Sequence, residues 1–241
     1  MKTIGIIGGL GPEATIDYYK EIIHHFNLKN QTGNAVYPEI VIYSVDMWKF
    51  VGLLGQKKYE EAVDYLVRRV NSLGKSGVDF AVLSANTPHL LFNEIQSKVD
   101  IPLISIVEAC AREAQSLSVK KCGLIGTKFT MQNDFYRKVF LQYQMDIVVP
   151  GPEQIEYINQ KVFNEIELGI FKEETKNEFL EIVGDMQKQH GIEAVILGCT
   201  EFPLMFREEA YLGMPFLNTT KIHVEAILKE CLKPEVVKRD L

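Results

Sequence analysis

The stretch GIEAVILGCTEFPLMF, residues 191–206, decides how this chain folds. Its four apolar residues 194–197 follow a glycine turn and stop at Gly198, which is typical of a strand buried on both faces in a parallel sheet. The polar residues that follow the strand are Cys199, Thr200 and Glu201. Loops and helix amides converge at the carboxyl ends of such strands, so we expect a functional site at this point.

The same pattern occurs twice in the chain. GVDFAVLSANTPHLLF, residues 77–92, aligns with the first stretch without a gap and places Ala85 opposite Cys199. An earlier pair matches in the same order, because IGIIGG at residues 4–9 aligns with CGLIGT at residues 122–127. Two matched pairs predict an α/β protein with two similar lobes, each with a parallel sheet flanked by helices, and with strand ends that face one another across a cleft.

Length and composition agree with two lobes. A chain of 241 residues can form two small domains, and its 46% hydrophobic content allows a sizeable core. We expect residues 1–103 together with 213–241 to form the first lobe, and residues 104–212 to form the second.

The charge balance limits the possible partners. The chain has 26 basic and 32 acidic residues, a net charge of -6 and no basic cluster, which argues against nucleic acid as a partner. No signal peptide precedes the first strand, and no apolar run is long enough to span a bilayer. We therefore expect a cytoplasmic protein with no membrane contact and with reduced thiols.

Cys199 has a different setting from the other cysteines, because it lies in a turn between Gly198 and Thr200. A helix that starts beside the sulfur points its amide dipoles at it, which lowers the pKa of a thiol. We therefore predict that Cys199 is reactive. The other three lie inside apolar patterns and are expected to be buried and inert: Cys110, Cys122 and Cys231.

Small polar residues follow both repeated strands, and they suit a small acidic substrate. They are Asn86, Thr87, Thr200 and Glu201. Their side chains and amides can bind carboxylate oxygens without a bulky cation. Helix capping is the competing interpretation, and for Thr200 it is about as good.

Other features allow two interpretations each. Residues 47–55 combine a tryptophan with two glycines, which suits either a flap over the site or a packed connecting segment. Tyr157 and Lys161 lie one turn apart on an expected helix, where they either bind a carboxylate or form a solvated face. His89 and His223 lack metal-ligand spacing, so no metal site is predicted, and His223 is either a hydrogen-bonding group near the site or a buried helix residue.

Four motifs, which together span nearly the whole chain, resemble those of the aspartate/glutamate racemase family. They are MKTIGIIGGLGPEAT at residues 1–15, SANTPH at 84–89, GTKFTM at 126–131 and LGCTEFPLM at 197–205. The resemblance implies two α/β lobes related by a pseudo-twofold axis, with the active site between them. It also implies a homodimer and proton chemistry without pyridoxal phosphate or a metal. It also implies two cysteines on opposite faces of the substrate, one removing the α-proton while the other donates a proton.

The chain departs from that family where the first cysteine is expected, because it has Ala85 there. Some members have threonine at this position, but an alanine neither takes nor gives a proton. Ser84 is adjacent, yet neighbouring strand residues point to opposite faces, so it is a poor substitute. Asn218 stands where many members have aspartate, and the arginine that some aspartate-specific members use is replaced near Trp48. These changes leave the choice between aspartate and glutamate open.

The leading interpretation is a cofactor-independent racemase of aspartate or glutamate, with Cys199 as one acid/base and Ala85 at the place of the other. The substrate-binding residues that we predict are Gly9, Asn86, Thr87, Thr127, Thr200 and Glu201. Ala85 leaves two alternatives open, a single-cysteine decarboxylase or isomerase of the same superfamily and a non-catalytic dicarboxylate-binding protein.

Overall fold

The structure, a computed structural model, describes residues 1–29 and 36–234. Two compact units divide the chain: one from the described parts of Met1–Ser84, Leu91–Ile104 and Val224–Leu241, the other from Ala85–Leu90 and Ser105–His223. Of the polar loop that the sequence predicts at residues 29–34, only Lys29 is described, as the last residue of a helix. The charged tail from residue 235 onward, predicted to fray, lies outside the described residues.

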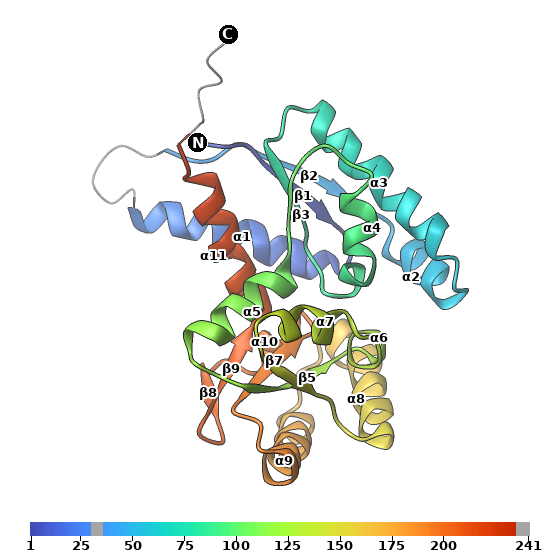
Figure 1. Cartoon of the computed structure of the whole chain (residues 1–241), viewed down its shortest axis with the longest axis vertical. Helices are drawn as coiled ribbons and strands as arrows, with labels where there is room; N and C mark the ends of the chain where they lie inside the picture. The colour runs from blue at the N-terminus through green and yellow to red at the C-terminus, as the bar shows by residue number, and fades with distance from the viewer. Residues whose placement is uncertain (30–35, 235–241) are drawn as a thin grey trace. The chain divides into compact units, whose positions relative to one another are not determined.

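A four-stranded parallel sheet forms the centre of the first unit (Figure 1). Its strands are β1 (Ile4–Gly8), β2 (Ile40–Ser44), β3 (Phe80–Leu83) and β4 (Leu103–Ile104), in the spatial order β2-β1-β3-β4. Its helices are α1 (Pro12–Lys29), α2 (Met47–Gly55), α3 (Tyr59–Lys75), α4 (Phe92–Gln96) and the later part of α11 (Thr219–Cys231). Because strand residues alternate between faces, Ile4 and Ile6 share one buried core with α1 and α11.

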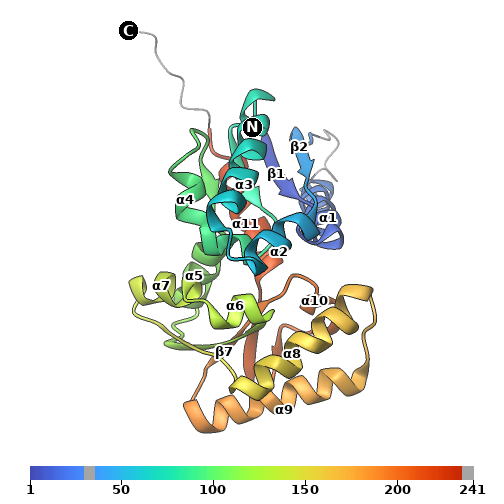
Figure 2. The same cartoon turned by 90° about the vertical axis from the view of Figure 1, so that its right-hand side faces the viewer.

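A five-stranded sheet forms the centre of the second unit. Its strands are β5 (Lys121–Gly126), β6 (Asp146–Val148), β7 (Ala194–Gly198), β8 (Ala210–Tyr211) and β9 (Met214–Asn218), in the order β6-β5-β7-β9-β8, with β8 antiparallel to β9. The helical segments are η2 (Thr87–Leu91), α5 (Ile106–Ser116), α6 (Lys128–Gln132), α7 (Phe135–Gln142), α8 (Pro152–Asn164), η3 (Ile166–Leu168), α9 (Glu173–His190) and α10 (Phe202–Met205). Ile196 packs with α5 and α7 on one face of the sheet, and Leu197 packs with α8 and α9 on the other. Helices α8 and α9 lie side by side there (Figure 2).

The strand order confirms the predicted fold of two parallel-sheet lobes. In each unit the first strand pairs with the second strand on one side and the third on the other, giving β2-β1-β3 and β6-β5-β7. The register agrees as well, because Ile7 pairs with Leu83 and Ile125 pairs with Leu197. The repeat seen in the sequence is therefore a repeat of strand topology.

The division between the units differs from the expected boundaries at residues 213–223. We placed this segment in the first lobe, but it belongs to the second unit. The reason is that β9 continues the second sheet, where Val195 pairs with Phe216. Residues Ala85–Leu90, expected in the first lobe, also belong to the second unit.

Residues 47–55, predicted as either a flap over the site or a packed connecting segment, form a regular helix, α2. Asp46 caps its N-terminus by accepting a hydrogen bond from the Lys49 amide at 3.1 Å. Phe50 and Leu54 are buried on the side that packs against α3, whereas Trp48 is 68% exposed.

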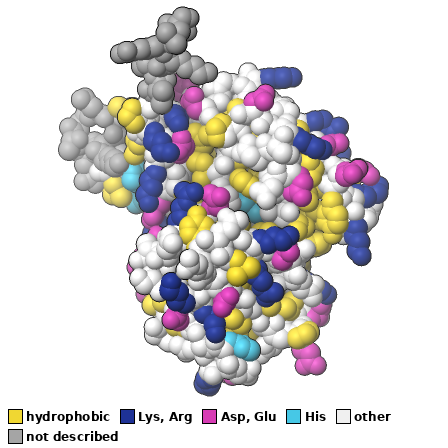
Figure 3. Space-filling model, in the orientation of Figure 1, with side chains coloured by type: hydrophobic (Ala, Val, Ile, Leu, Met, Phe, Trp, Pro, Cys, Tyr) yellow, Lys and Arg dark blue, Asp and Glu magenta, His cyan; other side chains and the backbone are white. Residues whose placement is uncertain are grey.

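None of the described helices is long and apolar enough to cross a bilayer. On the face shown in Figure 3, basic and acidic side chains are interspersed.

The backbone is closely packed at Gly198, the last residue of β7, next to Cys199. A β-carbon there would lie 2.9 Å from the Ile125 carbonyl oxygen and 2.9 Å from Leu124 Cδ1. We expect Gly198→Ala to lower the free energy of unfolding by about 1–3 kcal/mol through this overpacking, as measured by urea denaturation.

Gly184→Ala is the matched control for that change. Gly184 lies within α9, and a β-carbon there would meet its nearest neighbour, Leu212 Cδ1, at an ordinary 3.7 Å. Alanine favours a helix interior, so this variant should be as stable as the parent or more stable by up to about 1 kcal/mol. Equal effects of the two changes would contradict the packing argument.

Candidate functional site

Cys199 follows the last residue of the central strand β7, in the core of the second unit. It is only 4% exposed, and its Sγ donates a hydrogen bond to Glu201 Oε2 at 3.0 Å. Thr200 Oγ1 donates to the same carboxylate oxygen at 2.9 Å. The sequence GCTE thus forms a thiol, a hydroxyl and a carboxylate joined at one oxygen atom.

The prediction of a lowered thiol pKa is wrong. Burial raises the pKa of Cys199 well above its usual range, and the nearby carboxylates of Glu201 and Glu167 raise it further. The expected helix dipole is weak, because α10 has only four residues and begins after Glu201. With its pKa raised, Cys199 is a neutral thiol that donates its proton in the hydrogen bond to Glu201 Oε2.

Glu167 is a site residue that the sequence analysis missed. It lies on the short helix η3, and one of its carboxylate oxygens lies within 4.8 Å of both the Cys199 sulfur and a Glu201 oxygen. Burial raises the pKa of Glu167 to about 7, with a further contribution from the charge of Glu201. No local motif indicates this role, because only the tertiary fold brings η3 to the end of β7.

The donor set of these three residues fits a metal ion chemically. A thiolate and two carboxylates are ligands that zinc accepts, and their mutual distances are compatible with one ion. No metal site is predicted from the sequence, in which Glu167 lies far from Cys199 and Glu201.

Glu165, two residues before Glu167, has the opposite environment. Its buried carboxylate accepts hydrogen bonds from Thr175 at 2.6 Å and from Lys161 and Lys172 at 3.0 Å each. The Thr175 hydrogen bond and then the two lysines hold the pKa of Glu165 at about 2. The negative charge of Glu165 is therefore balanced by Lys161 and Lys172 of the same chain.

The predicted Tyr157–Lys161 pair does bind carboxylates, but they belong to the protein. Tyr157 donates a short hydrogen bond to Glu178, while Lys161 donates to Glu165. Both side chains connect α8 to the segments that follow it. Their positions support the α8–α9 packing.

Asn86 is held by a chain of hydrogen bonds inside the second unit. Tyr136 Oη donates to Asn86 Oδ1 at 2.6 Å, and Asn86 Nδ2 donates to Thr219 Oγ1 at 3.2 Å. Thr219 then donates to the Leu197 carbonyl at 2.8 Å. These contacts link the segment after β3 to the strand that leads to Cys199, and they use two of the four hydrogen bonds that the Asn86 side chain can make.

His89 fixes the backbone at position 85. Its Nε2 accepts from the Ile106 amide at 3.2 Å, so Nδ1 carries the proton and donates to the Ala85 carbonyl at 2.9 Å. Burial, followed by the neighbouring His223, lowers the pKa of His89 to about 3, so the ring is neutral at physiological pH. Ala85 itself is buried.

The remaining predicted residues have structural contacts. Thr127 caps α6 by accepting from the Thr130 amide at 3.3 Å, and Thr87 begins η2. Gly9, in the first unit, has a left-handed φ of +76° and donates its amide to Thr15 Oγ1 at 2.9 Å. Ser84 Oγ is buried and donates to the Ile7 carbonyl at 3.1 Å.

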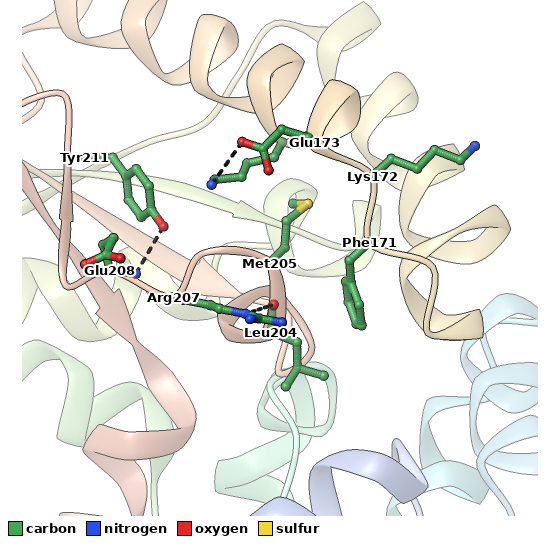
Figure 4. A pocket seen from close by; sticks show the side chains of 9 residues that line it. Phe171, Lys172, Glu173, Leu204, Met205, Arg207, Glu208 and Tyr211 are labelled. Carbon is green, nitrogen blue, oxygen red and sulfur yellow. Dashed lines mark hydrogen bonds and ion pairs between the residues drawn. The ribbon is translucent and has the colours of Figure 1, made fainter.

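A separate pocket of 370 Å³ lies where the start of α9 meets the α10–β8 segment (Figure 4). Its lining mixes Arg207, Lys172 and Lys176 with Glu173 and Glu208. None of the predicted site residues lines it, so it is distinct from the Cys199 cluster.

Comparison with known proteins connects the chain to a family. The model of the family described as Asp/Glu/Hydantoin racemase matches residues 7–227. The chain is 34% identical, with a TM-score of 0.81, to the structure of an aspartate racemase homologue from Pyrococcus horikoshii OT3, covering 97% of this chain and 100% of that one. It is 30% identical, with a TM-score of 0.86, to a putative Asp/Glu racemase from Yersinia pestis, with the same coverage.

A curated relative matches over a shorter span. The broad specificity amino-acid racemase RacX of Bacillus subtilis (strain 168) is 31% identical over 137 residues, which are 56% of this chain and 59% of RacX. The match therefore spans less than two thirds of that relative's length.

Glu165 and Glu167 should give opposite dependences of stability on pH. The lowered pKa of Glu165 stabilises the fold above the ordinary glutamate pKa of 4.5, and this stabilisation is lost as pH falls toward 2. We expect Glu165→Gln to cost about 2 kcal/mol at pH 7 and much less at pH 3, as measured by denaturant unfolding.

For Glu167 the pKa is raised, so the folded state binds the proton more tightly and is destabilised as pH rises from 4.5 through about 7. The acidic neighbour that faces it is Glu201, with the Cys199 thiol beside both. Glu167→Gln should therefore be more stabilising at pH 8 than at pH 5. The same sign of pH dependence for both variants would contradict the assigned environments.

Proposed function

The chain belongs to the Asp/Glu/hydantoin racemase family, and on that basis we propose that it racemises an amino acid with Cys199 as an acid/base at the α-carbon. The observation that carries this proposal is the Cys199 thiol, hydrogen-bonded at 3.0 Å to a buried carboxylate at the end of β7. Proton transfer needs such a donor–acceptor contact before anything else.

Glu201 supplies the base that a neutral thiol requires. Because the pKa of Cys199 is raised, its proton has to move to Glu201 Oε2 before the sulfur can accept the α-proton. The thiolate then takes the proton from the α-carbon, whose electron pair passes into the substrate carboxylate. No electrons leave the substrate, so the step needs no redox cofactor, and we propose that it needs no pyridoxal phosphate.

This chain differs from the two-cysteine pattern of the resemblance at the second face of the substrate α-carbon. A base that returns its own proton restores the original enantiomer, so a single thiol exchanges the α-hydrogen with solvent without inverting the centre. Ala85 stands where the resemblance places the second proton donor. We expect hydrogen exchange in this chain to be faster than racemisation.

Aspartate and glutamate, the substrates implied by the resemblance, are the reference substrates for these tests. The broad specificity named for RacX is a reason to assay other side chains as well. Ala85 also favours a second candidate, a single-cysteine decarboxylase or isomerase. Loss of carbon dioxide, measured beside solvent deuterium exchange, separates these reactions.

Cys199→Ser should reduce α-hydrogen exchange by about 100- to 10,000-fold, because a serine hydroxyl is a far weaker acid and a poorer base partner than a thiol. Exchange is measured by NMR in deuterium oxide. Cys231→Ser is the matched control, because this buried thiol in α11 donates to the Lys2 carbonyl and should leave exchange unchanged. Full exchange by Cys199→Ser would refute the role of the thiol.

Ala85→Cys should raise racemisation more than it raises exchange, because it adds a proton donor at the missing position. We expect at least about a tenfold increase in the ratio of racemisation to exchange, measured by chiral chromatography beside NMR. Ala85→Val, which adds bulk without a titratable group, is the control. An unchanged ratio in Ala85→Cys would mean that position 85 does not face the α-carbon.

A further inference from the structure

The pocket shown in Figure 4 lies within the second unit and shares no lining residue with the Cys199 cluster. One wall is the segment 171–176, in which α9 begins, and the other is the segment 204–211, which leads from α10 to β8. Its volume of 370 Å³ falls within the range of about 300–1,000 Å³ that is typical of sites for small organic molecules. The side chains that line the pocket therefore indicate which kind of molecule fits it.

Five charged residues line this pocket, and three of them have partners within the protein. Lys172 donates a hydrogen bond to Glu165 at 3.0 Å. Lys176 forms an ion pair with Glu173 at 3.2 Å, and both of these residues belong to the lining. These three charges are balanced by the chain itself, so they do not require a charged ligand.

Arg207 and Glu208 are the other two charged residues, and they do not pair with each other. Among residues 1–29 and 36–234, neither of them has an ion-pair partner. Arg207 Nε donates to the Leu204 carbonyl at 3.2 Å, which leaves the donors on its two terminal nitrogens available. Figure 4 shows the Arg207 side chain extending toward Leu204, while Glu208 lies beside Tyr211. The pocket thus offers one available positive charge and one available negative charge.

Apolar side chains form much of the remaining lining. Met205 is buried, whereas Phe171 is 36% exposed and Leu204 is 38% exposed. Contact of such side chains with water is unfavourable, so an apolar group of a ligand that covers them is stabilised. Tyr211 Oη accepts a hydrogen bond from the Glu208 amide at 3.0 Å, and its own proton remains available to an acceptor on a ligand.

We propose that this pocket binds a free α-amino acid with an apolar side chain, of the leucine class. The carboxylate of the amino acid binds the Arg207 guanidinium, whose planar shape suits two parallel hydrogen bonds. The ammonium binds the Glu208 carboxylate, and the side chain covers Phe171 and Leu204. A ligand with both charges satisfies both available groups, whereas an ion of one sign satisfies only one. This binding site does not depend on the proposed reaction at Cys199.

Calorimetry with the full chain tests which parts of the ligand are recognised. L-Leucine is compared with 4-methylpentanoate, which lacks the ammonium, with 3-methylbutylamine, which lacks the carboxylate, and with glycine, which lacks the apolar side chain. Inorganic phosphate serves as a simple anion. We expect leucine to bind with a Kd of about 1 mM or lower. Each of the other probes should bind about fivefold or more weakly, because each loses one of the three contacts.

Two variants assign the contacts to residues. Arg207→Gln and Glu208→Gln should each lower the affinity for leucine about fivefold or more. Glu208→Gln should not weaken binding of 4-methylpentanoate, and Arg207→Gln should not weaken binding of 3-methylbutylamine, because each of these ligands lacks the group that the residue binds. Arg68→Gln is the matched control, since this exposed arginine lies on α3 of the first unit. Circular dichroism checks that the variants are folded, and the comparison of ligands needs no variant.

Four results would each overturn the amino-acid site. They are no binding of leucine at about 10 mM, equal binding of leucine and either singly charged analogue, tighter binding of phosphate than of leucine, and unchanged leucine affinity in both Arg207→Gln and Glu208→Gln. The last result would place leucine elsewhere on the protein, for example at Cys199. Absence of α-hydrogen exchange would instead refute the proposed function, and it has no bearing on binding in this pocket.

Discussion

The chemistry of the second unit depends on one hydrogen bond, from the buried thiol of Cys199 to the carboxylate of Glu201. Burial alone would leave the thiol as an inert apolar group, because its ionised form is costly in a core. The carboxylate changes this by offering an acceptor for the proton at 3.0 Å. Gly198 keeps this geometry possible, since the backbone of β5 leaves no room for a side chain at that strand end.

Two glutamates that lie two residues apart, Glu165 and Glu167, have opposite environments. Glu165 collects two lysines and a threonine and serves to fix the turn between α8 and α9. Glu167 follows on η3 with no hydrogen bond or ion pair to any described residue, and it lies toward Cys199. The first carboxylate therefore contributes stability, while the second stays available at a cost in stability. An uncompensated carboxylate beside a thiol is understandable at a binding site and is unfavourable elsewhere.

Strand positions and the two similar parallel-sheet lobes could be predicted from the sequence, because apolar runs bounded by glycine indicate buried parallel strands directly. β3 and β7 lie where the repeat places them. In the first sheet Ile7 pairs with Leu83, and at the equivalent place in the second sheet Ile125 pairs with Leu197. The assignment of β9 failed because pairing partners depend on the tertiary fold. The prediction of a lowered pKa for the Cys199 thiol failed for a similar reason. The sequence indicates that a helix starts after Cys199, but it does not show that this helix has one turn or that Glu167 lies nearby.

The repeat copies the scaffold and not the chemistry. At the end of β3, Ser84 donates to the Ile7 carbonyl within the first sheet, and Ala85 follows it without a reactive group. At the end of β7 the equivalent positions are Gly198, which has no side chain, and Cys199, which has the thiol. His89 and Asn86 nevertheless hold the Ala85 segment in place, through hydrogen bonds to Ile106, Tyr136 and Thr219. In the proposed racemase, a fixed position 85 without a titratable group would separate binding of the substrate from inversion of its centre, because the scaffold around position 85 persists when the proton donor is absent.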